Sequence, residues 1–358
     1  MHVPDGFIDA PVSLATGAVA AAAVAVSLRG ARREHGGTSH ASSYGGERTA
    51  PLAGLVAAFV FAAQMLNFPV AAGTSGHLLG GALAAILVGP ATGVLCISVV
   101  LLMQGVLFAD GGLTALGVNI SDMAVVTTVV SYALFRLLVK ALPRRRPSVT
   151  VAAFVAALVS VPAAACAFTL IYALGGTTDV PIGKVFTAMV GVHVLIGLGE
   201  AAITALTVGA VMAVRPDLVH GARGLARPLE LRNADGTVLQ PQVSTAAPRS
   251  NRRIMTVGLV AALALAGFVS YYASTSPDGL EKVAHDKGID SKEREHAVKD
   301  SPLADYQVKD VDDERISGGL AGVIGVGATL AAGTGVFVVV RRRRDRAETA
   351  ASDRIEAV

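Results

Sequence analysis

Long apolar stretches separated by short polar connections run through most of the chain. Stretches of about twenty apolar residues have the length that crosses a bilayer as a helix. The pattern predicts nine spans, with the third and fourth joined only by the Gly89-Pro90 turn. The third is short, so we expect it among other helices rather than against lipid. The predicted ranges are 10–28, 51–66, 77–89, 91–108, 119–142, 149–174, 184–214, 254–273 and 318–340.

Composition supports a membrane protein. Of the 358 residues, 53% are hydrophobic and 16% are charged, whereas about a quarter of a soluble domain is charged. We therefore expect an all-α, multi-pass integral protein of the cell membrane, with the lipid bilayer around it. Cys96 and Cys166 fall inside apolar stretches, which indicates small core residues rather than a disulfide or a metal pair. The small net charge of +3, with arginines at the ends of spans, argues against nucleic-acid binding.

The basic residues predict the orientation, because Lys and Arg concentrate in cytoplasmic connections. They follow the first, fifth, seventh and ninth stretches, whereas the connections 67–77 and 108–117 have none. With nine spans, all basic connections share one side if the amino terminus is outside and the carboxyl terminus inside. The residues are Arg29, Arg32, Arg33, Arg48, Lys140, Arg144, Arg145, Arg146, Arg215, Arg223, Arg227, Arg232, Arg249, Arg341, Arg342, Arg343 and Arg344.

The same pattern divides the chain into parts. Residues 1–215 form a seven-span core, 216–253 a polar cytoplasmic linker, 254–340 a two-span unit, and 341–358 a basic cytoplasmic tail. Within the two-span unit, the connection 274–316 carries seven Lys or Arg and twelve Asp or Glu. It is expected outside, since long loops escape the orientation rule.

The first residues, MHVPDGF, offer a chelate. The α-amine of Met1, the amide of His2 and its imidazole Nδ1 close two small rings around one ion. Planar nitrogen coordination suits Ni(II) and Cu(II), and imidazole suits late first-row metals generally. The Pro4-Asp5-Gly6 turn is expected to hold the terminus in place. The alternative is a disordered end, as most chain ends are, although no targeting leader explains this one.

A fourth ligand has a candidate in NFPVAAGTSGHLLGGAL, where His77 ends a loop rich in small residues. Those residues let backbone approach closely, as an ion site near a membrane mouth requires. His77 and His2 are both expected at the outer face, so joint coordination is sterically allowed. The alternative is an interfacial histidine with no ligand role.

Other polar residues near the outer face or inside spans are candidates to orient His77 by accepting its other ring N–H, or to line a pathway. Plain structural roles are the alternative. His193 and Glu200, seven residues apart, share one helix face. Asn119, close to Asp122 at the start of the fifth span, can equally be an N-cap. The candidates are Asp5, Ser75, Gln104, Asp110, Asn119, His193 and Glu200.

Three functional classes follow from these residues: a metal-capture subunit, an autonomous divalent-metal permease or channel, and an intramembrane hydrolase. Ser75 and His77 are too close in sequence to hydrogen-bond easily, and no G-x-S-x-G elbow occurs, which disfavours a hydrolase. Most spans lack the polar residues of a permease pathway. No G-x-x-x-x-G-K-[ST] loop occurs, so ATP-driven uptake needs partner ATPases.

Small residues on the first span offer a close-packing face for a partner helix, or pack inside the core. They are Ala18, Ala22 and Ala25.

Four stretches across residues 1–215 resemble successive motifs of the CbiM/NikM family: MHVPDGFID, FPVAAGTSGHLLGGALAAILVGP, QGVLFADGGLTALGVNISDM and GVHVLIGLGEAAITAL. These proteins are substrate-capture (S) components of energy-coupling-factor (ECF) ABC transporters. The resemblance implies a seven-helix S-component core and Met1, His2 and His77 as metal ligands. It implies Co(II) or Ni(II) as transported substrate, with no catalytic cofactor. It also implies a transmembrane coupling (T) subunit and ATPase (A) subunits as partners.

A second resemblance covers the two-span unit. STSPDGLEKVAHDKG is similar to the PDGLE domain of CbiN/NikN-like accessory subunits, which implies a role in loading metal onto the core. His285 and His296, with neighbouring carboxylates, are weak candidate ligands in this segment. The alternative for both is a solvated loop.

Overall fold

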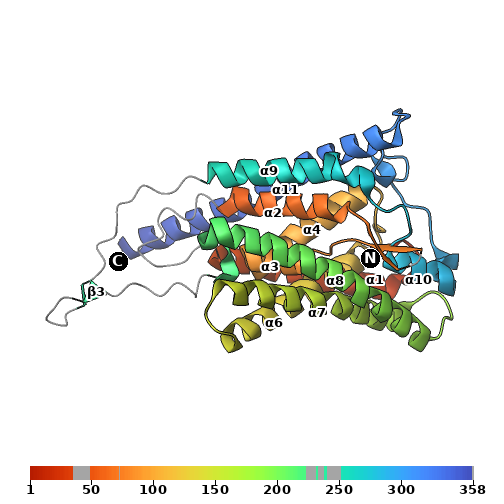
Figure 1. The fold of residues 1–358 in the computed structure, drawn as a ribbon, viewed down its shortest axis with the longest axis horizontal. Coiled ribbons are helices and arrows are strands. Elements are labelled where there is room, and N and C mark those ends of the chain that lie inside the picture. Colours follow the sequence, from red (N-terminus) through yellow and green to blue (C-terminus); the bar gives the residue numbers. More distant parts are fainter. Residues whose placement is uncertain (35–48, 72, 223–230, 233–237, 240–250, 357–358) are drawn as a thin grey trace.

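The protein is described by a computed structural model that covers residues 1–34, 49–71, 73–222, 231–232, 238–239 and 251–356. Long helices run side by side along one axis (Figure 1). Two short antiparallel hairpins pair β1 (Phe68–Ala71) with β2 (Thr74–Gly76), and β3 (Leu231–Arg232) with β4 (Val238–Leu239). The helices are α1 (Ala10–Glu34), α2 (Thr49–Gln64), α3 (Gly81–Val88), α4 (Pro90–Leu107), α5 (Leu116–Asn119), a π-helical stretch (Ile120–Val126), α6 (Thr127–Ala141), α7 (Arg146–Gly175), α8 (Ile182–Val214), α9 (Arg252–Gly267), α10 (Gly279–Lys287) and α11 (Glu314–Glu356).

Seven helical stretches in this described part are long and apolar enough to cross a membrane. They are α1, α4, α5 through α6, α7, α8, α9 with the turn after it, and the first 27 residues of α11. The prediction of a multi-pass membrane protein is therefore confirmed, and the fold is mostly helical apart from the two hairpins. Two of the nine predicted spans are shorter than the bilayer requires, since α2 has 16 residues and α3 has eight.

The predicted third span, 77–89, is helical only from Gly81 onward. Gly80 has a φ of +86°, a left-handed conformation that interrupts a right-handed helix. The N–H groups of Leu79 and Gly80 donate to the two carboxylate oxygens of Glu200, at 2.6 and 3.0 Å, so this side chain satisfies N–H groups just ahead of α3. All eight residues of α3 are buried, as expected for a helix enclosed by others.

The two-span unit packs against the core mainly through α2. Helix α11 lies along α2 and α9, and α9 also contacts α2. A Cβ built at Gly54 of α2 would lie 2.2 Å from Thr334 Oγ1 of α11, so the missing side chain lets the two helices approach closely. On the other side of the bundle, α7 packs along α8 and α6, and α1 along α4.

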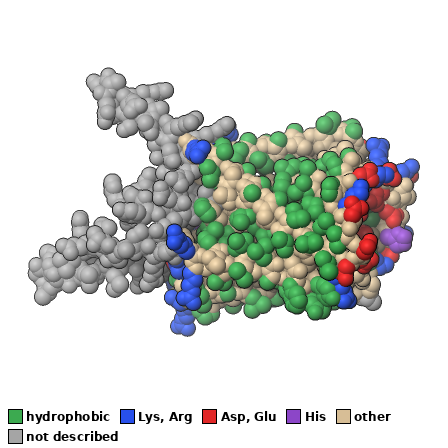
Figure 2. Space-filling model, turned by 90° about the horizontal axis from the view of Figure 1, so that it is seen from above, with side chains coloured by type: hydrophobic (Ala, Val, Ile, Leu, Met, Phe, Trp, Pro, Cys, Tyr) green, Lys and Arg blue, Asp and Glu red, His purple; other side chains and the backbone are tan. Residues whose placement is uncertain are grey.

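The two ends of the bundle differ in charge. Figure 2 shows hydrophobic side chains around the middle, Lys and Arg at the end next to the grey residues, and Asp, Glu and His together with further Lys and Arg at the other end. The amino terminus and α10 lie at the acidic end (Figure 1). Most of the predicted linker 216–253 falls outside the described residues. So do the following basic residues: Arg48, Arg223, Arg227 and Arg249.

Candidate metal centre

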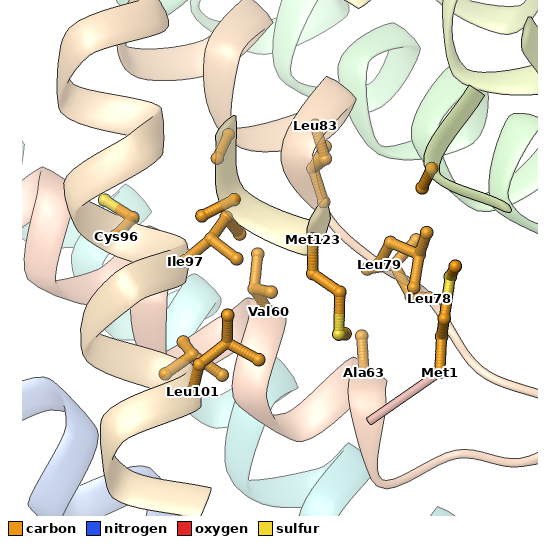
Figure 3. Close-up of a cluster of buried hydrophobic side chains, with 14 of the residues drawn as sticks. Met1, Val60, Ala63, Leu78, Leu79, Leu83, Cys96, Ile97, Leu101 and Met123 are labelled. Carbon is orange, nitrogen blue, oxygen red and sulfur yellow. The ribbon is translucent and has the colours of Figure 1, made fainter. Parts of the chain in front are cut away.

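The amino terminus is packed into the protein rather than disordered. Met1 is only 2% exposed, and its side chain lies in a hydrophobic cluster that includes Leu78, Leu79 and Ala63 (Figure 3). Burial of this apolar side chain favours one fixed position for the chain end. The alternative of a disordered terminus is therefore wrong.

The Val3 backbone, which follows His2, is hydrogen-bonded by two residues: Gly112 in the connection after α4, and Asn119 at the end of α5. Asn119 Oδ1 accepts from the Val3 N–H at 2.7 Å, and Asn119 Nδ2 donates to the Val3 carbonyl at 3.2 Å. The Gly112 N–H also donates to that carbonyl, at 2.9 Å. Asn119 is the last residue of α5 and its side chain is used on Val3, so the N-cap alternative for Asn119 is wrong.

The Pro4-Asp5-Gly6 turn attaches the terminus to the same connection. Gly6 has a φ of +93°, which a residue with a side chain rarely adopts. The Asp5 carboxylate accepts from the N–H groups of Thr114 at 2.8 Å and Leu113 at 3.3 Å. Asp5 thus fixes the chain as it leaves the site.

His77 follows strand β2 and aims its ring at the Met1 amine. Its Nδ1 lies 3.0 Å from the Leu78 carbonyl, which only accepts, so Nδ1 carries the proton. The other nitrogen, Nε2, therefore presents a lone pair 2.8 Å from the α-amine of Met1. Burial, and then the nearby terminal ammonium, lower the pKa of His77, so the ring is neutral at pH 7. We expected one of the polar candidates to accept the His77 N–H; the acceptor is this backbone carbonyl instead.

His2 lies against His77 and pairs with Asp110. The two rings meet edge to face with centroids 5.2 Å apart. The Nδ1 of His2 is 2.6 Å from Asp110 Oδ1, within ion-pair range but outside hydrogen-bond geometry, and Nε2 has no hydrogen-bond partner. Burial alone would raise the pKa of Asp110, but His2 and then the Tyr306 hydroxyl lower it to about 2. Asp110 is therefore a carboxylate at pH 7.

A second carboxylate, Asp278, contacts the site from the 274–316 segment. Its Oδ2 lies 2.6 Å from the Met1 amine and 3.5 Å from His77 Nε2. Burial would raise the pKa of Asp278, but the terminal ammonium outweighs it and holds the pKa well below its ordinary value. Asp278 was not among the residues singled out from the sequence.

The spacing of the nitrogens fits a metal ion. Two donors at right angles, each about 2.0 Å from the metal, are about 2.8 Å apart. The Met1 amine and His77 Nε2 have that separation, and His2 follows directly in the chain. Within the described ranges, no group of three or more His, Cys, Asp and Glu side chains is placed to hold a metal ion. A site here therefore depends on the terminal amine.

The remaining candidates lie around this cluster in different ways. Ser75 Oγ donates to the Ser276 carbonyl at 2.7 Å and not to His77, which does not fit a hydrolase nucleophile. Gln104 Nε2 donates to the Tyr306 hydroxyl, which in turn donates to Asp110. The predicted shared face of α8 is buried. On this face, the Glu200 carboxylate accepts from the backbone N–H of Leu79, just after His77. The Nδ1 of His193 bonds the Met189 carbonyl, and its Nε2 has no hydrogen-bond partner.

A cavity of about 1320 Å³ opens beside the cluster at the acidic end of the bundle. The core contributes His2, His77 and Asp110 to its walls, and the 274–316 segment contributes Asp278 and Tyr306. An ion reaching the nitrogens from this end therefore passes between the two units.

Sequence reasoning missed Asp278 and Tyr306 because both belong to the other unit. A local signal for Asp278 exists, since Asp278 and Glu281 have the spacing of a capping box, but it does not reveal the contact with Met1. His285 and His296, the two weak candidates of this segment, contact other groups. His285 has an 80% exposed side chain paired with Asp290, and His296 Nε2 faces the Gly111 carbonyl.

Seven apolar helices and a buried cluster of nitrogen donors define a multi-pass membrane protein with a candidate transition-metal site. Residues 2–218 match the CbiM family, described as the cobalt uptake substrate-specific transmembrane region, and residues 252–342 match the PDGLE domain. The chain belongs to the CbiM family and carries a PDGLE domain after it.

Named relatives agree with this assignment. The chain is 41% identical over 219 residues to a putative metal transport protein of Haloquadratum walsbyi, covering 61% of this chain and 93% of that protein. It is 38% identical over 225 residues to the putative fused nickel transport protein NikMN of Archaeoglobus fulgidus, covering 62% and 68%. A crystal structure of a transition metal transporter aligns with a TM-score of 0.50 and 26% identity, covering 60% of this chain and 93% of that one.

Proposed function

We propose that this chain is the S component of an ECF-type ABC importer and captures Co(II) or Ni(II) at the outer face of the membrane. The observation that carries the proposal is the α-amine of Met1 held 2.8 Å from Nε2 of His77, with His2 beside both. Family membership supports cobalt or nickel as the transported substrate.

The proposed ligands are the Met1 amine, the amide and Nδ1 of His2, and Nε2 of His77. His77 is already the right tautomer, because Leu78 holds its Nδ1 proton. Nδ1 of His2 faces Asp110, so coordination through this nitrogen requires the ring to turn from the carboxylate toward the amine. The backbone beyond is fixed by Asn119 on Val3, which limits the movement to His2 itself.

The proposed topology puts the acidic end outside and the basic end in the cytoplasm, with the amino terminus out and the carboxyl terminus in. The distribution of basic side chains supports it, because cytoplasmic ends of membrane proteins carry the excess of Lys and Arg. The metal cluster and the 274–316 segment then both face the outside, where the ion is captured.

Energy for uptake is proposed to come from partners, a transmembrane T subunit and A-type ATPases. The three small residues noted on α1 are exposed rather than packed inside the core, so a partner helix has access to them. They are Ala18, Ala22 and Ala25. An autonomous permease is the alternative, and uptake measurements separate the two.

Uptake should require the partners. In cells lacking their own cobalt and nickel importers, we expect labelled nickel or cobalt to accumulate only when this chain is produced with its T and A subunits. A matched strain carrying an ATPase-inactive A subunit should resemble the strain with this chain alone. Equal uptake by this chain alone would favour the permease and overturn the S-component assignment.

A further inference from the structure

We propose that Asp278 is the residue through which the PDGLE domain acts on the metal site, by holding the Met1 amine against His77 in the position required for capture. This inference rests on the proposed function, because it assigns a role in that same site. It makes Asp278 a positioning residue supplied by the second unit of the chain.

The contacts of Asp278 are short and involve both of the closest donors. Its Oδ2 is 2.6 Å from the Met1 amine and 3.5 Å from His77 Nε2, while the amine itself is 2.8 Å from that nitrogen. Hydrogen bonds between ionised groups are shorter and about twice as strong as neutral ones. Among the described residues, Asp278 is the carboxylate that touches the amine. A buried ammonium without such a partner is costly.

The other oxygen of Asp278 is committed to the start of α10. Oδ1 accepts from the Glu281 N–H at 2.8 Å, and Glu281 Oε2 accepts from the Asp278 N–H at 3.1 Å. This reciprocal capping box fixes the carboxylate relative to the helix. One oxygen therefore holds α10 and the other holds the amino terminus.

The residues around Asp278 fix α10 to the core. The Pro277 carbonyl accepts from the Ser75 N–H at 2.9 Å, two residues before His77. A Cβ built at Gly279 would lie 2.7 Å from Ile196 Cδ1 of α8, so α10 starts in close contact with that helix. Leu280 is 1% exposed. All five residues of the Pro-Asp-Gly-Leu-Glu motif thus contribute to placing one carboxylate at the amine.

The competing explanation is that Asp278 serves only as the N-cap of α10 and that its contact with the amine has no effect on capture. Removing the charge of Asp278 distinguishes this explanation from the proposed role. Asn caps a helix as well as Asp does, so Asp278→Asn keeps α10 and its docking but removes the charge. The amide would also present either an uncharged oxygen or an N–H group to the ammonium. If only the cap matters, this substitution changes nothing at the metal site.

The experiment compares purified full-length Asp278→Asn with Asp286→Asn. Asp286 lies on the same helix, is exposed and pairs with Lys282, so its loss removes an equal charge away from the site. The first readout, without metal, is the acylation rate of the Met1 amine, followed by mass spectrometry of the amino-terminal peptide. The second readout is nickel affinity by titration.

We expect acylation about tenfold faster in Asp278→Asn, because the charged hydrogen bond that holds the amine is gone. We expect nickel affinity about tenfold weaker, the scale on which partners of metal ligands act. Asp286→Asn should match the wild type in both readouts.

Unchanged nickel affinity in Asp278→Asn, or an equal loss in Asp286→Asn, would overturn the role proposed for Asp278. Wild-type protein that bound neither nickel nor cobalt would overturn the proposed function and this role with it. The acylation readout separates these results, because it reports the contact between Asp278 and the amine without any metal.

Discussion

Replacing His77 by alanine is expected to weaken nickel or cobalt binding by more than about 100-fold, because even residues that only orient metal ligands change affinity by 10- to 100-fold. The ring is buried, neutral and fixed as the tautomer whose Nε2 lone pair faces the Met1 amine. The substitution removes the nitrogen that faces the Met1 amine at 2.8 Å, and with it the proposed fourth ligand. The measurement is metal content after equilibration and desalting of the purified protein.

His285→Ala is the matched control. Its ring is exposed on the 274–316 segment and pairs with Asp290, so its removal should leave metal binding within about twofold of the wild type. Thermal unfolding of both variants shows whether either is misfolded. A folded His77→Ala protein that binds nickel like the wild type would remove His77 from the site.

The second large effect is expected from extending the chain ahead of Met1. Four residues, Gly-Ser-Gly-Ser, would convert the primary amine into a peptide nitrogen, whose lone pair is delocalised into the carbonyl. The extension would also have to pass His77 and Asp278, which enclose the amine at 2.8 and 2.6 Å. We expect nickel binding to fall below detection in the same desalting measurement.

The control carries the same four residues after Val358, far from the metal site in the sequence. It should bind one nickel ion with wild-type affinity. If the amino-terminal extension also bound with wild-type affinity, the amine would not be a ligand and the chelate would be wrong.

The proposed ligands were accessible from the sequence because their chemistry is local. An amine and an imidazole on adjacent residues form a chelate wherever the chain folds, and the alternation of basic connections placed His77 on the same side. Those two arguments identified Met1, His2 and His77, which the structure brings together. They did not reveal that His2 pairs with Asp110, which depends on the path of the connection after α4.

Two features of the structure, the late start of α3 and the contact of Asp278 with Met1, involve contacts between residues far apart in the sequence, which local patterns do not reveal. The predicted third span is too long: α3 begins only after Gly80, whose φ is +86°, and Glu200, 121 residues from Leu79, binds the N–H groups just before it. Asp278 was missed because its partner Met1 is 277 residues away. Hydropathy and local spacing carry no information about which carboxylate of an acidic segment docks on which loop.

The most direct test of the central claim is an experimental structure of the nickel-loaded protein, with the ion located by anomalous scattering at the nickel edge. We predict a single strong peak within about 2.2 Å of both the Met1 amine and Nε2 of His77. A peak elsewhere, for instance on His285 and Asp290, with the amine still paired to Asp278, would contradict the account.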